Sequence, residues 1–150
     1  MHIRRCEERD RELYLRLARE FYHSPAVQHP VPDSYFERTF DEMMRSDVYA
    51  DGFLLEDEDG TCMGYALTAK SFSQECGGQC VWVEGVSRSC RPIRVGGMGS
   101  RVFELLNAYY PDCCRFRLEV EPENEGAARL YRRLGYEALR YDQYVLERQE

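Results

Sequence analysis

The sequence predicts one domain of the α/β (α+β) class, with a mixed, mostly antiparallel central sheet and about four helices distributed over both faces. The chain has 150 residues, of which 43% are hydrophobic, so it has the length of one domain and enough apolar side chains for a core. Two helical patterns follow a short first strand, three strand-like runs come next, and a helix, a strand, a helix and a strand complete the chain. Hairpins followed by a strand–helix–strand crossover produce a mixed sheet.

The N-terminal part is expected to form one edge strand and a pair of helices. Residues 2–6 form the strand, and Arg9 to Phe21 carries apolar residues at helical spacing. A proline-rich stretch then disfavours helix, because the residue before each proline avoids the helical region. Asp33 or Ser34 can cap the second helix. Its apolar residues are Phe36, Phe40, Met43 and Met44.

The middle of the chain is expected to form a hairpin and a central strand. Gly52 to Leu55 is a strand pattern, the acidic run from Glu56 to Gly60 is a turn, and Cys62 to Phe72 returns antiparallel. Gly77-Gly78 then turns the chain again. The next strand runs from Cys80 to Glu84 and is expected at the centre of the sheet.

The C-terminal part alternates helix and strand. Ser100 to Tyr110 repeats apolar residues at helical spacing, and Arg115 to Val120 is a short strand. Asn124 to Leu134 is the last helix, which Gly135 ends in a left-handed conformation. Glu137 to Leu146 is expected to be the last strand.

The charge balance and hydropathy exclude several classes of partner. Asp and Glu number 27 against 20 Lys and Arg, a net charge of −7, which disfavours nucleic-acid binding and favours cationic partners. No apolar run exceeds about five residues, far short of the roughly 18 to 20 that a membrane-spanning helix needs. We therefore expect a cytoplasmic protein that binds neither nucleic acid nor membrane.

Seven cysteines are an odd number, so we expect reduced thiols rather than a disulfide framework. Cys76 and Cys80 are the one spaced pair that suggests a metal, but no second ligand pair follows at zinc-site spacing. We expect no metal. A thiol protein that senses metals or redox state remains an alternative on the cysteine count.

An island of positive charge separates Glu84 from Glu104, with no acidic residue between them. It contains the glycine-rich run Gly96 to Gly99, directly before a predicted helix. Backbone N–H groups and the helix dipole favour a phosphate at such a helix start. A glycine turn beside solvated arginines is the alternative interpretation. The arginines are Arg88, Arg91, Arg94 and Arg101.

The order of residues in this run distinguishes among the known phosphate-binding motifs. No Lys follows the glycines, as a P-loop requires, and the dinucleotide fingerprint is also absent. Arg94 to Gly99 instead matches Arg/Gln-x-x-Gly-x-Gly/Ala, and a second motif, Asn124 to Tyr136, follows after one helix and one strand. This pair of motifs resembles the GNAT superfamily of N-acetyltransferases.

The resemblance implies a sheet of six to seven strands, with a central strand pair that splays apart to admit acetyl-CoA as cosubstrate. Backbone around Val83 and Val86 would line the pantetheine arm, the glycine loop and Ser100 would bind the pyrophosphate, and Asn124 would orient the cofactor or a water. The loop residues are Arg94, Val95, Gly96, Gly97, Met98 and Gly99.

The resemblance also implies direct transfer of an acetyl group to a primary amine of a small molecule or peptide. Tyr131 corresponds to the family's general acid for the departing thiolate, although core packing would also place a tyrosine there. Glu84 is the candidate base, and pairing with an arginine is its alternative role. Proximity would supply much of the acceleration.

Two further expectations concern activity and assembly. The segment from Gly85 to Val95 departs from the family pattern, so a catalytically weak or inactive CoA-binding or regulatory module is the second hypothesis. The last strand, with Tyr141, Tyr144 and Val145, offers an edge through which a homodimer could form.

Overall fold

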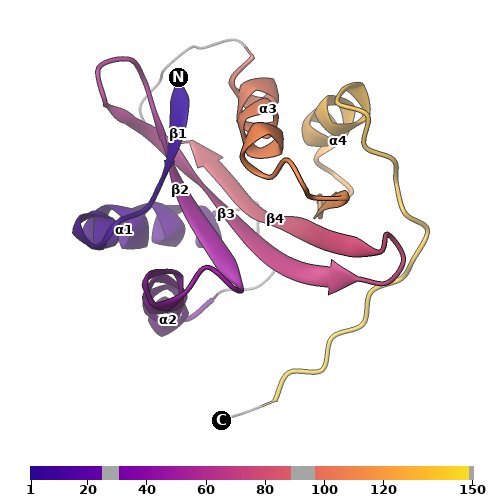
Figure 1. Cartoon of the computed structure of the whole chain (residues 1–150), viewed down its shortest axis with the longest axis horizontal. Helices are drawn as coiled ribbons and strands as arrows, with labels where there is room; N and C mark the ends of the chain where they lie inside the picture. The colour runs from indigo at the N-terminus through magenta and orange to yellow at the C-terminus, as the bar shows by residue number, and fades with distance from the viewer. Residues whose placement is uncertain (25–30, 89–96, 149–150) are drawn as a thin grey trace.

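A computed structural model describes residues 1–24, 31–88 and 97–148, together with the side chains in these ranges except those of Arg88 and Met98. One sheet holds five strands in the order β1-β2-β3-β4-β5 within the described residues (Figure 1). The strands are β1 (His2–Arg5), β2 (Ala50–Glu56), β3 (Cys62–Ser73), β4 (Gly78–Arg88) and β5 (Arg115–Leu118). The first four strands pair antiparallel and β5 pairs parallel to β4, which confirms the predicted mixed sheet.

Four α-helices and one 3-10 helix lie in the described ranges of the chain. They are η1 (Glu8–Asp10), α1 (Arg11–Tyr22), α2 (Asp33–Arg45), α3 (Met98–Tyr109) and α4 (Glu125–Arg133). The helix order agrees with the sequence prediction, and Asn124 caps α4 as expected. Asp33 is the first residue of α2 rather than its cap, because Pro32, with its extended backbone, occupies the cap position.

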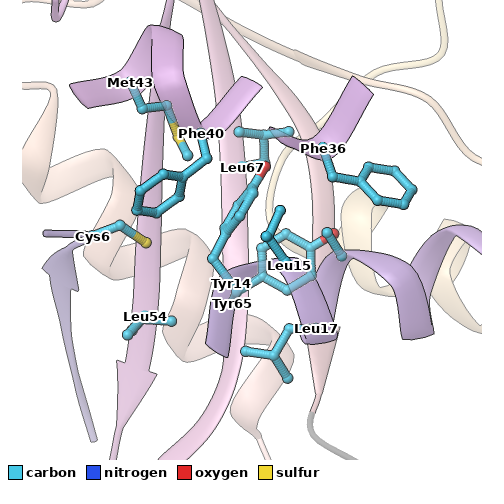
Figure 2. Close-up of a cluster of buried hydrophobic side chains, with 11 residues drawn as sticks. Cys6, Tyr14, Leu15, Leu17, Phe36, Phe40, Met43, Leu54, Tyr65 and Leu67 are labelled. Atoms are coloured by element: carbon cyan, nitrogen blue, oxygen red, sulfur yellow. The ribbon is translucent and has the colours of Figure 1, made fainter. Parts of the chain in front are cut away.

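Helices cover both faces of the sheet, and strand alternation divides the core between them. On β2, Leu54 faces α1 and α2, whereas Phe53 and Leu55 face α3. Figure 2 shows the cluster under α1 and α2, where aromatic rings from the helices and the sheet meet. Tyr14 of α1 packs edge to face against Tyr65 of β3 with ring centroids 5.8 Å apart.

A buried polar network anchors the end of α3 to the sheet. Asp51 of β2 is 2% exposed, and its Oδ2 accepts a hydrogen bond from the hydroxyl of Tyr110 at 2.7 Å. Lys70 of β3 donates to the same carboxylate, and Arg5 forms an ion pair with it at 2.8 Å. The network compensates the burial of this charge and fixes the C-terminal end of α3.

Two expectations about the C-terminal part are wrong. The sheet has five strands in the described residues rather than six to seven, and the segment from Glu137 to Leu146 forms no strand. Gly135 does adopt the predicted left-handed conformation with φ +88°, but the chain then continues extended and exposed (Figure 1). The local residue pattern predicted a strand in this segment. Whether a segment joins a sheet also depends on which sheet edge the chain reaches, and the local pattern does not contain that information.

Candidate active site

Glu84 lies in a β-bulge of β4, which lies between β3 and the edge strand β5 rather than at the expected centre of the sheet. In the ladder with β3, Leu67 opposes Gly85 and Thr68 opposes Val83, so Glu84 is the extra residue. A bulge redirects a side chain and breaks the regular ladder. The prediction that the strand ends at Glu84 is wrong, because β4 continues to Arg88 beyond the bulge.

The parallel pair of strands parts immediately before the bulge. β4 pairs with β5 from Cys80, opposite Arg115, to Val83, opposite Leu118, and the ladder ends there. Beyond Val83, β4 has no described strand on its β5 side, whereas its ladder with β3 continues. A strand edge of this kind can pair with an extended ligand through backbone hydrogen bonds. Val83 is buried at the last pair, and Val86 packs half-buried against the core under α3.

Two acidic groups and the end of α1 surround the bulge. The side chain of Glu84 is accessible to solvent. The protein atoms around its carboxyl nevertheless remove part of its hydration, which raises the pKa of Glu84. The negative charge of Glu119, just after β5, raises this pKa further. Burial raises the pKa of Tyr22, and the negative charge of Glu84 adds to this shift. A Cβ built on Gly85 would lie 3.1 Å from Cε1 of Phe21, so α1 approaches the strand closely here.

Sequence reasoning missed Phe21, Tyr22 and Glu119 as neighbours of Glu84. The helical pattern of α1 predicts which residues face the core, but not which strand position its last turn contacts. One signal was present, because a glycine inside a strand, as at Gly85, often marks a close approach by another part of the chain.

The N-terminus of α3 follows a glycine in the left-handed conformation. Gly97 has φ +87° and precedes Met98 as the N-cap, and no side chain of the described residues caps the helix. The first turn carries no acidic residue, so helix dipole and backbone N–H groups there favour an anion. Of the predicted loop residues, Arg94, Val95 and Gly96 lie outside the described part of the chain.

α4 packs closely against this helix start. A Cβ on Gly99 would lie 2.7 Å from Cδ2 of Leu130, so only glycine fits without displacing that side chain. Nη2 of Arg133, in the last turn of α4, donates to Oγ of Ser100 at 3.4 Å. Arg133 thus adds positive charge beside the first turn of α3, a position that the motif alone did not single out.

Tyr131 lies half-buried on the face of α4 that meets α3. Its ring packs edge to face against Phe103, with centroids 5.4 Å apart, and lies 6.0 Å from the ring of Tyr136. Burial raises the pKa of Tyr131 above 10, so its phenol keeps its proton at neutral pH. No hydrogen bond or ion pair within residues 1–24, 31–88 and 97–148 joins Tyr131 to Glu84.

Asn124 has a structural role at the start of α4. Its Oδ1 accepts a hydrogen bond from the backbone N–H of Ala127 at 3.1 Å, which caps the helix. The NH₂ of the amide keeps two donor hydrogens for a further partner.

Four of the cysteines gather where β4 and β5 begin. The thiol of Cys114 donates to the sulfur of Cys76, and the pKa of Cys80 responds to the charges of Cys76 and Cys113. Among the described residues, no group of three His, Cys, Asp or Glu side chains is placed to hold a metal. The described part of the chain also contains no helix long and apolar enough to cross a membrane.

The chain belongs to the acetyltransferase (GNAT) family, whose sequence profile matches residues 12–136. The comparison with curated proteins finds no match. A possible acetyltransferase from Clostridium difficile 630 has a similar structure, with a TM-score of 0.82 and 14% identity, over 99% of this chain and 98% of that one. AAC(6')-Iy bound to the bisubstrate analogue CoA-S-monomethyl-acetylneamine is also similar, with a TM-score of 0.74 and 17% identity over 98% and 97%.

A third similar structure is the ribosomal-protein-alanine N-acetyltransferase from Brucella melitensis biovar Abortus 2308. It matches with a TM-score of 0.71 and 17% identity, over 98% of this chain and 99% of that chain. At these identities the likeness establishes a shared fold and does not select an acceptor.

Proposed function

We propose that this chain is an acetyl-CoA-dependent N-acetyltransferase that transfers the acetyl group directly to a primary amine. The observation that carries the proposal is the position of Glu84, in a bulge beside the point where β4 and β5 part. This arrangement puts a carboxyl group of raised pKa next to a strand edge that can hold an extended ligand. Family membership supplies the class of reaction, and the site supplies the residues.

The residues around α3 fit the phosphates of acetyl-CoA. The backbone N–H groups at Met98, Gly99 and Ser100 would bind the pyrophosphate, since the first turn has no competing acid and Gly97 turns the chain into it. We assign the same role to Arg94, Val95 and Gly96 from their motif. The β4 backbone from Val83 to Val86 would pair with the pantetheine arm.

Glu84 and Tyr131 would handle the two protons of the reaction. The amine nitrogen bonds to the thioester carbonyl carbon, and the carbon–sulfur bond breaks. Glu84 accepts the proton that the amine loses, directly or through a water, and the phenol of Tyr131 donates a proton to the departing sulfur. Such proton transfers contribute about 10²- to 10⁴-fold each. We expect Asn124 to orient the cofactor or a water through its NH₂ group.

We propose a cationic amine on a small molecule or peptide as the acceptor. Glu84 and Glu119 put negative charge at the bulge, and the whole chain carries a net charge of −7, which attracts cations. The similar structures include an aminoglycoside N-acetyltransferase and a ribosomal-protein-alanine N-acetyltransferase, so both acceptor classes belong in a screen.

The first test is thermal unfolding with and without acetyl-CoA. A ligand at about 100 times its Kd adds ~2.7 kcal/mol, which corresponds to roughly 5–10 °C for a domain of this size. No shift at millimolar acetyl-CoA would contradict the cofactor site.

The second test is acetylation of an amine panel, followed by mass spectrometry because free cysteines would interfere with thiol dyes. Acetylated product supports the enzyme. Binding of acetyl-CoA without turnover of any amine would instead assign the chain to the non-catalytic CoA-binding alternative.

A further inference from the structure

A pair of thiols joins the turn between β3 and β4 to the start of β5. Cys76 lies in that turn, Cys114 comes directly before β5, and both are reduced. The thiol of Cys114 donates to the sulfur of Cys76 at 2.6 Å. In a disulfide bond the two sulfurs are about 2.05 Å apart. The fold therefore holds these two sulfurs close to bonding distance, although the residues are distant in sequence.

Contacts of neighbouring groups hold Cys114 in this position. Its backbone N–H donates to the first carbonyl group of β4 beyond Gly78 at 3.0 Å. Arg115, next in the chain, donates to Glu75, which precedes Cys76, at 2.6 Å. A Cβ on Gly78 would lie 2.9 Å from Sγ of Cys114, so the glycine leaves room for the sulfur. The turn and the start of β5 are thus positioned by groups other than the thiols themselves.

The two neighbouring cysteines are less suited to such a pair. Cys80 is only 1% exposed. Cys113 packs against the core under α3, and its thiol donates to the carbonyl group of Arg115 at 3.0 Å. Cys76, in contrast, is half-buried and Cys114 is exposed. Among the described cysteines, Cys76 and Cys114 therefore combine sulfur contact with access for a small reagent.

The two thiols differ in their tendency to ionise. The hydrogen bond from Cys114 lowers the pKa of Cys76, and the positive charge of Arg115 lowers it further. The same hydrogen bond raises the pKa of Cys114. Because the thiolate is the nucleophile, Cys76 should react first and Cys114 second. An accessible thiol of lowered pKa beside a second thiol is the arrangement of redox-sensing cysteines.

We propose that Cys76 and Cys114 form a redox site at which a hydroperoxide produces a disulfide bond within the chain. The thiolate of Cys76 attacks the O–O bond, which breaks. The sulfur keeps one oxygen as a sulfenic acid, and the other leaves, protonated by solvent, as water or an alcohol. The thiol of Cys114 then attacks this sulfur and loses its proton, and water departs as the S–S bond forms. The two sulfurs together lose two electrons, which the hydroperoxide gains.

The bond would hold β5 to β4 at the end of their ladder that lies away from the proposed cofactor site. The ladder ends at Val83, opposite Leu118, where the strands part, and the thiols lie before its first pair. The loop that the bond closes includes the whole of α3. Closing a loop of this length restricts the unfolded chain, so the oxidised protein should be more stable than the reduced protein.

Peptide mapping after oxidation tests the site. Reduced protein is treated with a small molar excess of hydrogen peroxide, blocked with an alkylating reagent and digested without reductant. Mass spectrometry should find Cys76 linked to Cys114, and dithiothreitol should release both thiols by exchange. A non-reducing gel should show single chains. Cys113→Ala is the matched control and should form the same bridge, because its thiol bonds to a carbonyl group outside the pair.

Two further variants test the order of the steps and the effect of the bond. Cys114→Ala should accumulate a sulfenic acid on Cys76, which dimedone traps as an adduct, whereas Cys76→Ala should give little adduct on Cys114. Thermal unfolding in reductant checks that every variant is folded. Oxidation should raise the melting temperature of wild type and Cys113→Ala by roughly 5–15 °C, and it should not raise that of Cys76→Ala or Cys114→Ala.

Several outcomes would overturn the proposal. A bridge to another cysteine, Cys90 included, would assign the chemistry to a different pair, and a bridge between chains would remove the tether. Oxidation of Cys76 to a sulfinic acid while the Cys114 thiol stays reduced would show that the second step does not occur. An unchanged melting temperature of the bridged protein would contradict the stabilising role of the bond.

Discussion

The Tyr131 ring meets the Phe103 ring edge to face, with centroids 5.4 Å apart, and this contact joins α4 to α3 beside the proposed active site. The ring has a packing role and the hydroxyl has a separate, proposed chemical role. Removing only the hydroxyl therefore separates the two roles.

Tyr131→Phe should lower kcat by about 10²-fold or more while the melting temperature changes little, because the ring contact stays and the proton donor is lost. Tyr136→Phe is the matched control, since it removes a buried hydroxyl from the adjacent ring. Steady-state kinetics and thermal unfolding measure both effects. Equal kcat values for wild type and Tyr131→Phe would exclude Tyr131 as the acid.

The pH dependence should report on Glu84. A base must be ionised, so kcat/KM should fall as pH decreases through the raised pKa of Glu84. Glu119→Gln removes a negative charge that raises this pKa, and the acidic limb of the profile should move to lower pH. A limb that stays in place in Glu119→Gln, or that persists in Glu84→Gln, would belong to another group.

Glu84 should also reduce stability. Its pKa in the folded state is raised above 4.5, so the folded state binds the proton more tightly than the unfolded state. The free energy of unfolding therefore falls as pH rises from 4.5 through the raised value, and the ionised carboxylate is destabilising above it. Glu84→Gln should melt at a higher temperature than wild type at pH 7, and the difference should vanish below pH 4.5.

The contact between α3 and α4 leaves little room for a side chain at Gly99. Gly99→Ala forces a methyl group against Leu130, and overpacking of this kind costs about 1–3 kcal/mol. In the double variant with Leu130→Ala, the methyl group has room. The loss of unfolding free energy in the double variant should therefore be smaller than the sum of the losses in the two single variants. Gly126→Ala on α4 is the control, because its nearest atom is 3.8 Å away, and it should be neutral or stabilising. Denaturant titration gives each value.

Among the cysteines that the structure describes, Cys76 should be the first to react with an alkylating reagent near neutral pH. The hydrogen bond from Cys114 lowers the pKa of Cys76, whereas burial raises the pKa of Cys6 to about 12. The thiolate is the nucleophile, so Cys76 should be labelled well before Cys6. Cys114→Ala should slow labelling of Cys76, as peptide mass mapping would show. An unchanged rate would mean that the hydrogen bond does not control the reactivity.

Local signals in the sequence predicted much of this fold correctly. Asn124 caps α4 and Gly135 ends it, since each acts through its own backbone neighbourhood. Glu84 was recognised as a candidate base, but its bulge was not, because a bulge is defined by the register of two strands that are distant in sequence. The prediction of a last strand from Glu137 to Leu146 was wrong for the same reason, because the sheet edge with which it would pair is distant in sequence.

Strand order in the sheet follows strand order along the chain, from β1 to β5. The hairpins β2–β3 and β3–β4 can thus form from near neighbours in sequence, whereas β5 joins only after the crossover through α3 and by four residue pairs. The chain must close the loop through α3, at a cost in conformational entropy, before the contacts between β4 and β5 contribute any stability. β5 should therefore dock late in folding. Native-state amide exchange should therefore be slowest in β3 and faster in β5, and the edge where β5 parts from β4 should become ordered late in folding.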